Sequence, residues 1–129
     1  MTEETPVNRE EIYDFIHREI DTIPHLEALL LIWKSSPRQW SAEEVAKELY
    51  VSEGTSQNVL QNLHRRGLLI ADNGLYRYAS TSIRRDSLVQ ALDATYRREL
   101  IPISKLIHAK GTAAMRDFAE AFRFTKGKE

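Results

Sequence analysis

Residues 41–69 constrain the fold most, because they carry two short amphipathic helices separated by a tight turn. Ser41 stands three residues before Glu44, which is the capping-box spacing that starts a helix. A second helix over residues 53–66 is predicted to end at Gly67, a residue type favoured just past a helix C-terminus. Its inward-facing apolar residues recur at helical spacing: Val59, Leu60 and Leu63.

Two short apolar runs follow this helix and predict a β-hairpin. They flank Asp72, Asn73 and Gly74, and Asn-Gly is the strongest short signal for a hairpin turn. Trp40, just before the first helix of the pair, is predicted to add a short third strand. Helix, turn, helix and hairpin together are the plan of a winged helix, whose second helix presents its outer side chains to the major groove of DNA.

The stretch from residue 25 to 79 resembles the winged helix-turn-helix transcriptional regulators of bacteria. The resemblance rests on the following residues: Val45, Ala46, Leu49, Val51, Ser52, Val59, Leu60, Leu63, Gly67, Leu68 and Leu69. It implies a mainly α fold with a small β-hairpin, and a sequence-specific DNA-binding regulator. The chain departs from the family habit at Ser56, where Val or Ala is usual, and in having few basic residues in the second helix and the wing.

The chain is predicted to divide into three segments. Residues 1–24 hold an N-terminal helix from Asn8 to Ile20, residues 25–80 form the winged helix, and residues 81–129 form a helical extension. Apolar positions of the extension recur at spacings of three and four, which predicts one long helix or two helices broken near Pro102. They are Leu88, Leu92, Tyr96, Leu100, Ile103 and Ile107.

The apolar faces of the extension need a covering surface. A winged helix closes its own core, so we expect a homodimer built mainly by residues 81–129. The alternative is that these faces pack within one chain against the helix Asn8–Ile20. A last helix over residues 112–124 places Met115, Phe118, Ala119 and Phe122 on one face, which also suits docking on another protein.

The outward face of the helix 53–66 supplies the candidate DNA contacts. Gln and Asn pair bidentately with adenine in the major groove, and Thr contacts a base or a thymine methyl. Arg65 and Arg66 are placed for phosphates at the far end of the helix, and Arg77 lies on the wing. The predicted base-reading residues are Thr55, Gln57, Asn58 and Gln61. The alternative is that these amides are ordinary solvated side chains.

The charge of the winged-helix segment favours a different class of partner. Residues 25–80 carry six basic and six acidic side chains, whereas dedicated DNA binders commonly show a basic footprint. Glu53, at the entrance of the second helix, would repel phosphates. A second hypothesis is therefore a winged-helix protein–protein interaction module that does not bind DNA.

Catalytic and cofactor chemistry find little support in the sequence. The chain has no cysteine, and its four histidines lie far apart without a partner at metal-ligand spacing. There is no Gly-rich phosphate loop and no nucleophile elbow, so neither an enzyme nor a cofactor or metal site is expected. The acidic N-terminus and the short apolar runs predict neither a signal peptide nor a membrane span, and hence a cytoplasmic protein.

Overall fold

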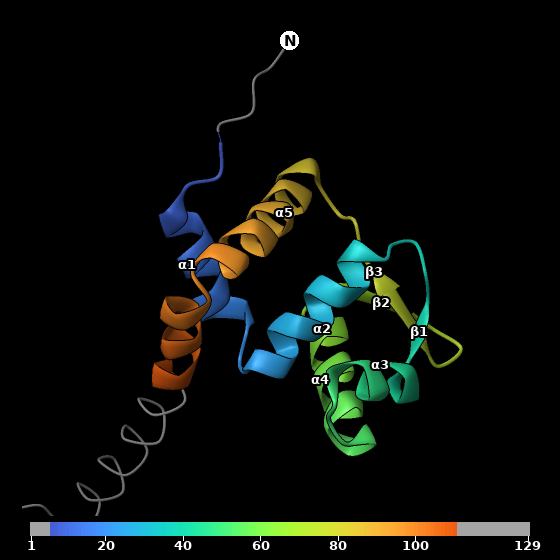
Figure 1. The fold of residues 1–129 in the computed structure, drawn as a ribbon. Coiled ribbons are helices and arrows are strands. Elements are labelled where there is room, and N and C mark those ends of the chain that lie inside the picture. Colours follow the sequence, from blue (N-terminus) through green and yellow to red (C-terminus); the bar gives the residue numbers. More distant parts are fainter. Residues whose placement is uncertain (1–5, 111–129) are drawn as a thin grey trace, which may run out of the picture.

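The computed structural model describes residues 6–110, and its elements follow the order expected for a winged helix with helical additions (Figure 1). The elements are α1 (Arg9–Glu19), α2 (Ile23–Lys34), β1 (Trp40–Ser41), α3 (Ala42–Leu49), α4 (Glu53–Arg65), β2 (Leu69–Asp72), β3 (Leu75–Tyr78) and α5 (Ile83–Arg98). Residues 100–110 form a further helix after α5. No helix among residues 6–110 is long and apolar enough to cross a membrane.

The helix starts follow the capping residues of the sequence. Asn8 caps α1, because its side chain accepts a hydrogen bond from the Glu11 N–H at 2.8 Å. Ser41 and Glu44 form the predicted capping box at the start of α3. Helix α2 begins at Ile23 and includes Pro24, since a proline is tolerated in the first turn of a helix, where its missing N–H would have no partner.

The end of α4 and the hairpin turn both use the left-handed backbone region. Gly67 has φ +81°, and the N–H of Leu68 reaches back to the Leu63 carbonyl at 2.9 Å, which closes a Schellman motif. Asn73 (φ 54°) and Gly74 (φ 79°) form a two-residue turn between β2 and β3. The predicted helix stop and hairpin are thereby confirmed.

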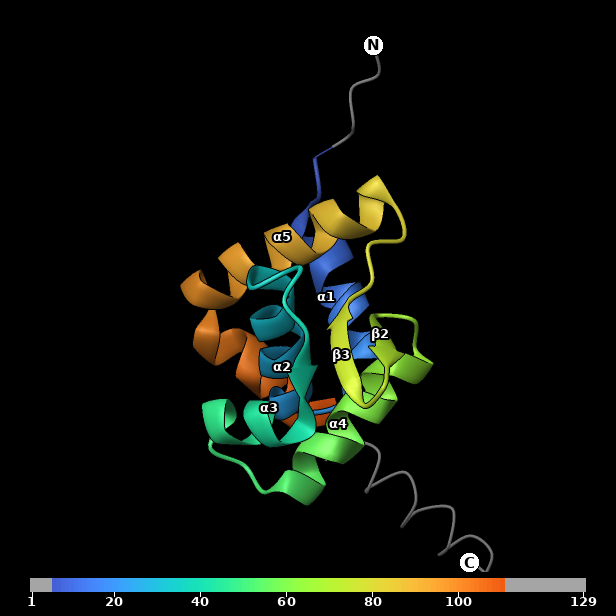
Figure 2. The same cartoon turned by 90° about the vertical axis from the view of Figure 1, so that its right-hand side faces the viewer.

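The three strands form one antiparallel sheet in the order β1-β3-β2. Trp40 in β1 pairs with Tyr76 in β3, so the predicted third strand is present. Figure 2 shows β2 and β3 as a hairpin lying over α4, and β2 contacts that helix. This is the wing of the fold.

Helix α2 is the centre of the molecule, since it contacts α3, α4, α5 and β3. Its residues Leu26, Leu29 and Ile32 are fully buried. Ser56 faces the same core from α4, and its hydroxyl donates a hydrogen bond to the Ala42 carbonyl at 2.7 Å. A serine is therefore tolerated at this apolar position, because its only buried polar atom has a partner.

The helical extension packs differently from our first expectation. The chain breaks between α5 and the helix 100–110 at Glu99, three residues before Pro102. Leu92, Ile103 and Ile107 are buried in one cluster with the apolar face of α1. The expectation that this stripe would face water without a second chain was therefore wrong for these three residues, because they are already buried within the single chain.

Two neighbouring apolar residues at the start of the helix 100–110 remain exposed. Leu100 is 52% and Ile101 is 65% exposed, and they stand side by side at the start of the helix 100–110. The expected helix 112–124, with its face from Met115 to Phe122, lies outside the described residues.

Candidate nucleic-acid interface

Helix α4 has one buried and one exposed face. Ser56, Val59, Leu60 and Leu63 point into the core, where α4 contacts α2 and α3. The opposite face exposes every base-reading residue that the sequence predicts, together with Arg65: Thr55, Gln57, Asn58, Gln61 and Arg65. The helical period alone produces this separation, because residues three or four apart share a face.

The N-terminus of α4 is held by Ser52. Its side chain accepts a hydrogen bond from the Thr55 N–H at 3.0 Å, and its hydroxyl donates to the Thr55 hydroxyl at 2.9 Å. The Thr55 hydroxyl thus keeps its own hydrogen for a further acceptor. Within residues 6–110, the amides of Gln57, Asn58 and Gln61 make no hydrogen bond to another side chain, so their donors and acceptors face solvent.

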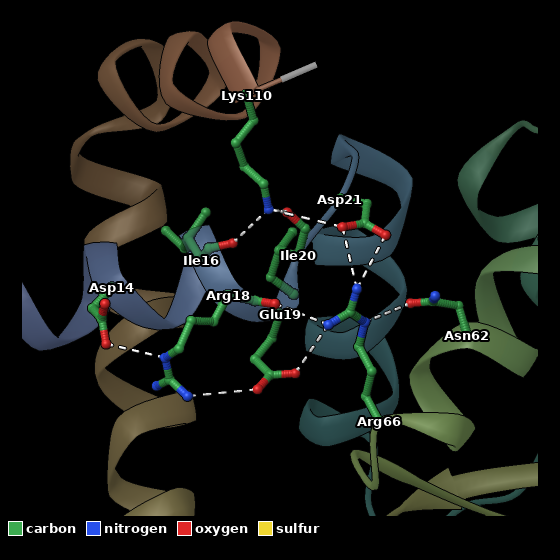
Figure 3. A network of polar contacts seen from close by, with 9 residues as sticks. All are labelled: Asp14, Ile16, Arg18, Glu19, Ile20, Asp21, Asn62, Arg66 and Lys110. Carbon is green, nitrogen blue, oxygen red and sulfur yellow. Dashed lines mark hydrogen bonds and ion pairs between the residues drawn. The ribbon is translucent and has the colours of Figure 1, made fainter. Parts of the chain in front are cut away.

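Arg65 and Arg66 are neighbours in sequence but have different surroundings. Arg65 is exposed and forms no ion pair within the described part of the chain. The Arg66 side chain is only 28% exposed, and its guanidinium contacts Glu19 and Asp21 at 3.3 Å (Figure 3). The structure therefore gives Arg66 an internal role, and we leave it out of the proposed phosphate contacts.

The wing offers one cation. Arg77 is half-buried on β3, opposite Ile70 of β2, while the turn itself carries Asp72. Arg38, a further cation beside the sheet, was not identified from the sequence; its guanidinium carbon lies 3.7 Å from the centre of the Trp40 ring. A basic residue two positions before the aromatic residue of a strand was the available signal.

The turn between α3 and α4 combines exposure with an unusual backbone. Tyr50 is 94% exposed and adopts φ 59°, a left-handed conformation that is rare for a bulky side chain. Glu48 and Glu53 flank it and are exposed as well. Negative charge therefore borders the N-terminal end of α4, which opposes phosphate approach on that side.

The described residues offer little to a metal ion or a small molecule. No group of three or more His, Cys, Asp or Glu residues in the range 6–110 could hold a metal ion. An open groove of about 260 Å³ lies between α2 and α5, lined in part by Leu30, Tyr96 and Arg97. Burial and the nearby Glu27 carboxylate raise the pKa of Tyr96 to about 12, so its hydroxyl stays protonated.

Comparisons with known proteins support the fold. No protein-family model matches this sequence, and no curated protein matches it. A crystal structure of a Mycobacterium tuberculosis MarR family protein superposes with a TM-score of 0.50 and 17% sequence identity. The match covers 92% of this chain and 85% of that chain. The likeness shows a mainly helical winged-helix fold with a small antiparallel sheet.

Proposed function

We propose that this protein is a sequence-specific, double-stranded-DNA-binding transcriptional regulator of a bacterial cytoplasm, and that α4 reads the major groove. One observation carries the proposal. A helix fixed by its apolar face turns a run of unpaired amide side chains to solvent, on a fold in which that helix is the one that enters DNA. Lys and Glu are better helix formers than Asn for a surface with no other task.

The contacts divide into two classes. Thr55, Gln57, Asn58 and Gln61 have the chemistry for base edges, and Arg65 and Arg77 have the chemistry for phosphates. Base contacts supply preference for one sequence, whereas phosphate contacts supply affinity for any sequence and make it salt-dependent.

The competing function is a protein–protein interaction module that does not bind DNA. It is favoured by the balanced charge of residues 25–80 and by the acidic side chains Glu48 and Glu53 beside the N-terminus of α4. A docking segment from Met115 to Phe122 would belong to this alternative.

We also propose a homodimer formed through the helical extension. Leu100 and Ile101 support it, because two adjacent exposed apolar side chains at one helix start gain from being covered. Sedimentation should show that Leu100→Glu shifts the full chain toward monomer. Ile83→Glu is the matched control, since Ile83 is 74% exposed at the opposite end of α5. A chain that is monomeric at high micromolar concentration contradicts the dimer.

Selection from a random duplex library at two salt concentrations tests DNA reading. We expect a palindromic site with half-sites about one helical turn apart, or a multiple of it. Changing Gln57, Asn58 or Gln61 to Ala should each weaken binding to that site by about 1–3 kcal/mol and relax preference at one or two base pairs.

The two arginines provide an internal control. Arg65→Ala should weaken binding to all sequences alike and reduce the slope of log affinity against log salt by about 1 per protomer, because a phosphate contact is lost. Arg66→Ala should leave that slope unchanged. If the selection enriches no motif, and binding matches that of an unrelated neutral protein, DNA reading is wrong and the protein-docking function takes its place.

A further inference from the structure

A cluster of charged side chains joins three parts of the chain that are distant in sequence. We call it the Asp21 cluster: Glu19, Asp21, Arg66 and Lys110. Asp21 lies in the junction between α1 and α2, Arg66 caps the end of α4, and Lys110 ends the described part of the helix 100–110. Figure 3 shows the Arg66 and Lys110 side chains approaching the Asp21 carboxylate from two sides.

Lys110 fastens the helix 100–110 to the end of α1. Its ammonium group donates hydrogen bonds to the carbonyls of Ile16, at 3.1 Å, and Ile20, at 2.5 Å. The carbonyls at the C-terminal end of a helix carry partial negative charge, so a cation is stabilising there. The same ammonium lies 3.8 Å from Asp21, and the Lys110 side chain is only 17% exposed.

Arg66 fastens the end of α4 to the same junction. Its Nε donates to the Asn62 side chain at 3.0 Å, one turn back along α4. Its Nη1 donates to the Arg18 carbonyl at 2.9 Å, and its Nη2 lies 3.3 Å from both oxygens of Asp21. A planar guanidinium with several donors fixes direction as well as distance, so the end of α4 is tied to the α1–α2 junction in a defined direction.

Asp21 is therefore the one carboxylate in the cluster that meets both cations. It attracts Lys110 from the helical extension and Arg66 from α4, while Glu19 contacts Arg66. Burial lowers the pKa of Lys110, and the neighbouring Asp21 and Glu19 carboxylates oppose that shift. Loss of the Lys110 charge removes the cation that holds the Asp21 carboxylate on the side away from Arg66 (Figure 3). It also leaves the Ile20 carbonyl without this donor, whereas the Ile16 carbonyl keeps its hydrogen bond from the Ile20 N–H at 3.0 Å.

We propose that Lys110 and Asp21 are positioning residues that set the orientation of α4 through Arg66, and so couple the helical extension to DNA affinity. This inference rests on the proposed function, because its biological readout is DNA binding. Coupling between two sites is reciprocal. A ligand or protein that binds the helical extension and draws Lys110 away from Asp21 should weaken DNA binding. Bound DNA should then weaken the binding of that ligand or protein by the same factor.

Lys110→Met tests the coupling, because it removes the charge and keeps an unbranched side chain. We expect DNA affinity to fall about 5-fold or more, within the usual range of coupling between sites. The slope of log affinity against log salt should not change, because no phosphate contact is lost. Lys105→Met is the matched control. Lys105 is exposed on the same helix, forms no ion pair within residues 6–110, and should leave affinity unchanged.

A double-mutant cycle tests whether the effect passes through Asp21. Asp21→Asn should weaken DNA binding in the same way as Lys110→Met, and the double variant should be no weaker than the worse single variant. Additive losses would mean that the two residues act separately, which overturns the coupling. Lys110→Arg, which keeps the charge, should retain most of the wild-type affinity.

A measurement without DNA separates this inference from the proposed function. The chain has no cysteine, so spin labels can be placed at His17→Cys in α1 and Gln61→Cys in α4, both of which are exposed. The distance distribution between them should broaden or shift with Lys110→Met and stay unchanged with Lys105→Met. If Lys110→Met does not fold by circular dichroism, Asp21→Asn takes its place, since Asp21 is 45% exposed.

The outcomes are distinguishable. A wild-type chain that selects no DNA, but whose label distance responds to Lys110→Met, refutes the proposed function and supports the positioning role. A chain that selects DNA, and in which Lys110→Met and Lys105→Met give the same affinity and the same distances, refutes the positioning role alone.

Discussion

Replacing Tyr50 with glycine should make this protein more stable. Tyr50 ends α3 with φ 59° and ψ 44°, and its N–H donates a hydrogen bond to the Ala46 carbonyl. The N–H of Val51 reaches the same carbonyl at 3.1 Å. The backbone here is that of a helix terminus at which glycine is the usual residue, because glycine has no Cβ to clash in the left-handed region.

The size of the effect follows from two opposing terms. A residue with a Cβ pays about 1–2 kcal/mol in this conformation. Glycine removes that strain but loses about 0.5–1 kcal/mol through the greater freedom of the unfolded chain. The ring is 94% exposed, so almost no buried area is lost with it. The expected gain is about 0.5–1 kcal/mol, or roughly 2–5 °C in Tm for a chain of this size.

Thermal and urea unfolding of three proteins measures this gain: wild type, Tyr50→Gly and Tyr50→Ala. Alanine removes the ring and keeps the Cβ, so it should stay within about 0.5 kcal/mol of wild type, as ordinary surface changes do. The difference between the two variants isolates the backbone strain. If Tyr50→Gly unfolds more easily than wild type, either the ring has a packing partner or the turn does not adopt a positive φ.

Three further predictions concern the core, a helix end and the acid limb of stability. Leu63→Ala should cost about 2–5 kcal/mol in urea unfolding, because Leu63 is fully buried; a loss below about 0.5 kcal/mol would contradict its core position. Gly67→Val should cost about 1–2 kcal/mol through the backbone alone, since φ is +81° and a Cβ would meet no atom within 4 Å; an unchanged melt would refute the assigned conformation. The Arg84 hydrogen bond lowers the pKa of Glu11 below its ordinary value of 4.5. The ionised Glu11 carboxylate therefore stabilises the folded chain above pH 4.5, and this stabilisation is lost as the pH falls through the pKa that Glu11 has in the folded state. Glu11→Gln should therefore flatten the pH dependence of stability below about pH 4.5, and an unchanged acid limb would show that the pair contributes nothing.

The parts of the fold that the sequence predicted depend on local rules. Ser41 with Glu44, Gly67, and Asn73 with Gly74 each act within a few residues, through a capping bond or a positive φ. Such signals can be recognised without the tertiary structure, because the residues that interact are neighbours in the chain. The exposed face of α4 was predictable for the same reason, since the helical period alone decides which side chains point away from the core.

The parts that escaped sequence reasoning depend on contacts between distant residues. Arg65 and Arg66 have the same side chain, and only the position of the α1–α2 junction decides that Arg66 turns toward Asp21. The spacing of Leu92 and Ile103 predicted a buried face, but the spacing alone could not predict whether a second chain or α1 would cover that face. An amphipathic pattern predicts a buried face without naming its partner.

The scarcity of cations on α4 and the wing shapes what DNA binding by this fold would look like. With Arg66 engaged internally, a dimer offers Arg65 and Arg77 from each protomer to the phosphates. Each neutralised phosphate contributes about −0.9 to the slope of log affinity against log salt. Two arginines from each protomer therefore give a slope of about −3 to −4, which is shallow for a dimeric DNA-binding protein. Non-specific binding would then be weak, and most of the discrimination would have to come from the amides of α4 at base edges. A measured slope of −8 or steeper would show that this protein meets DNA through a surface other than α4 and the wing.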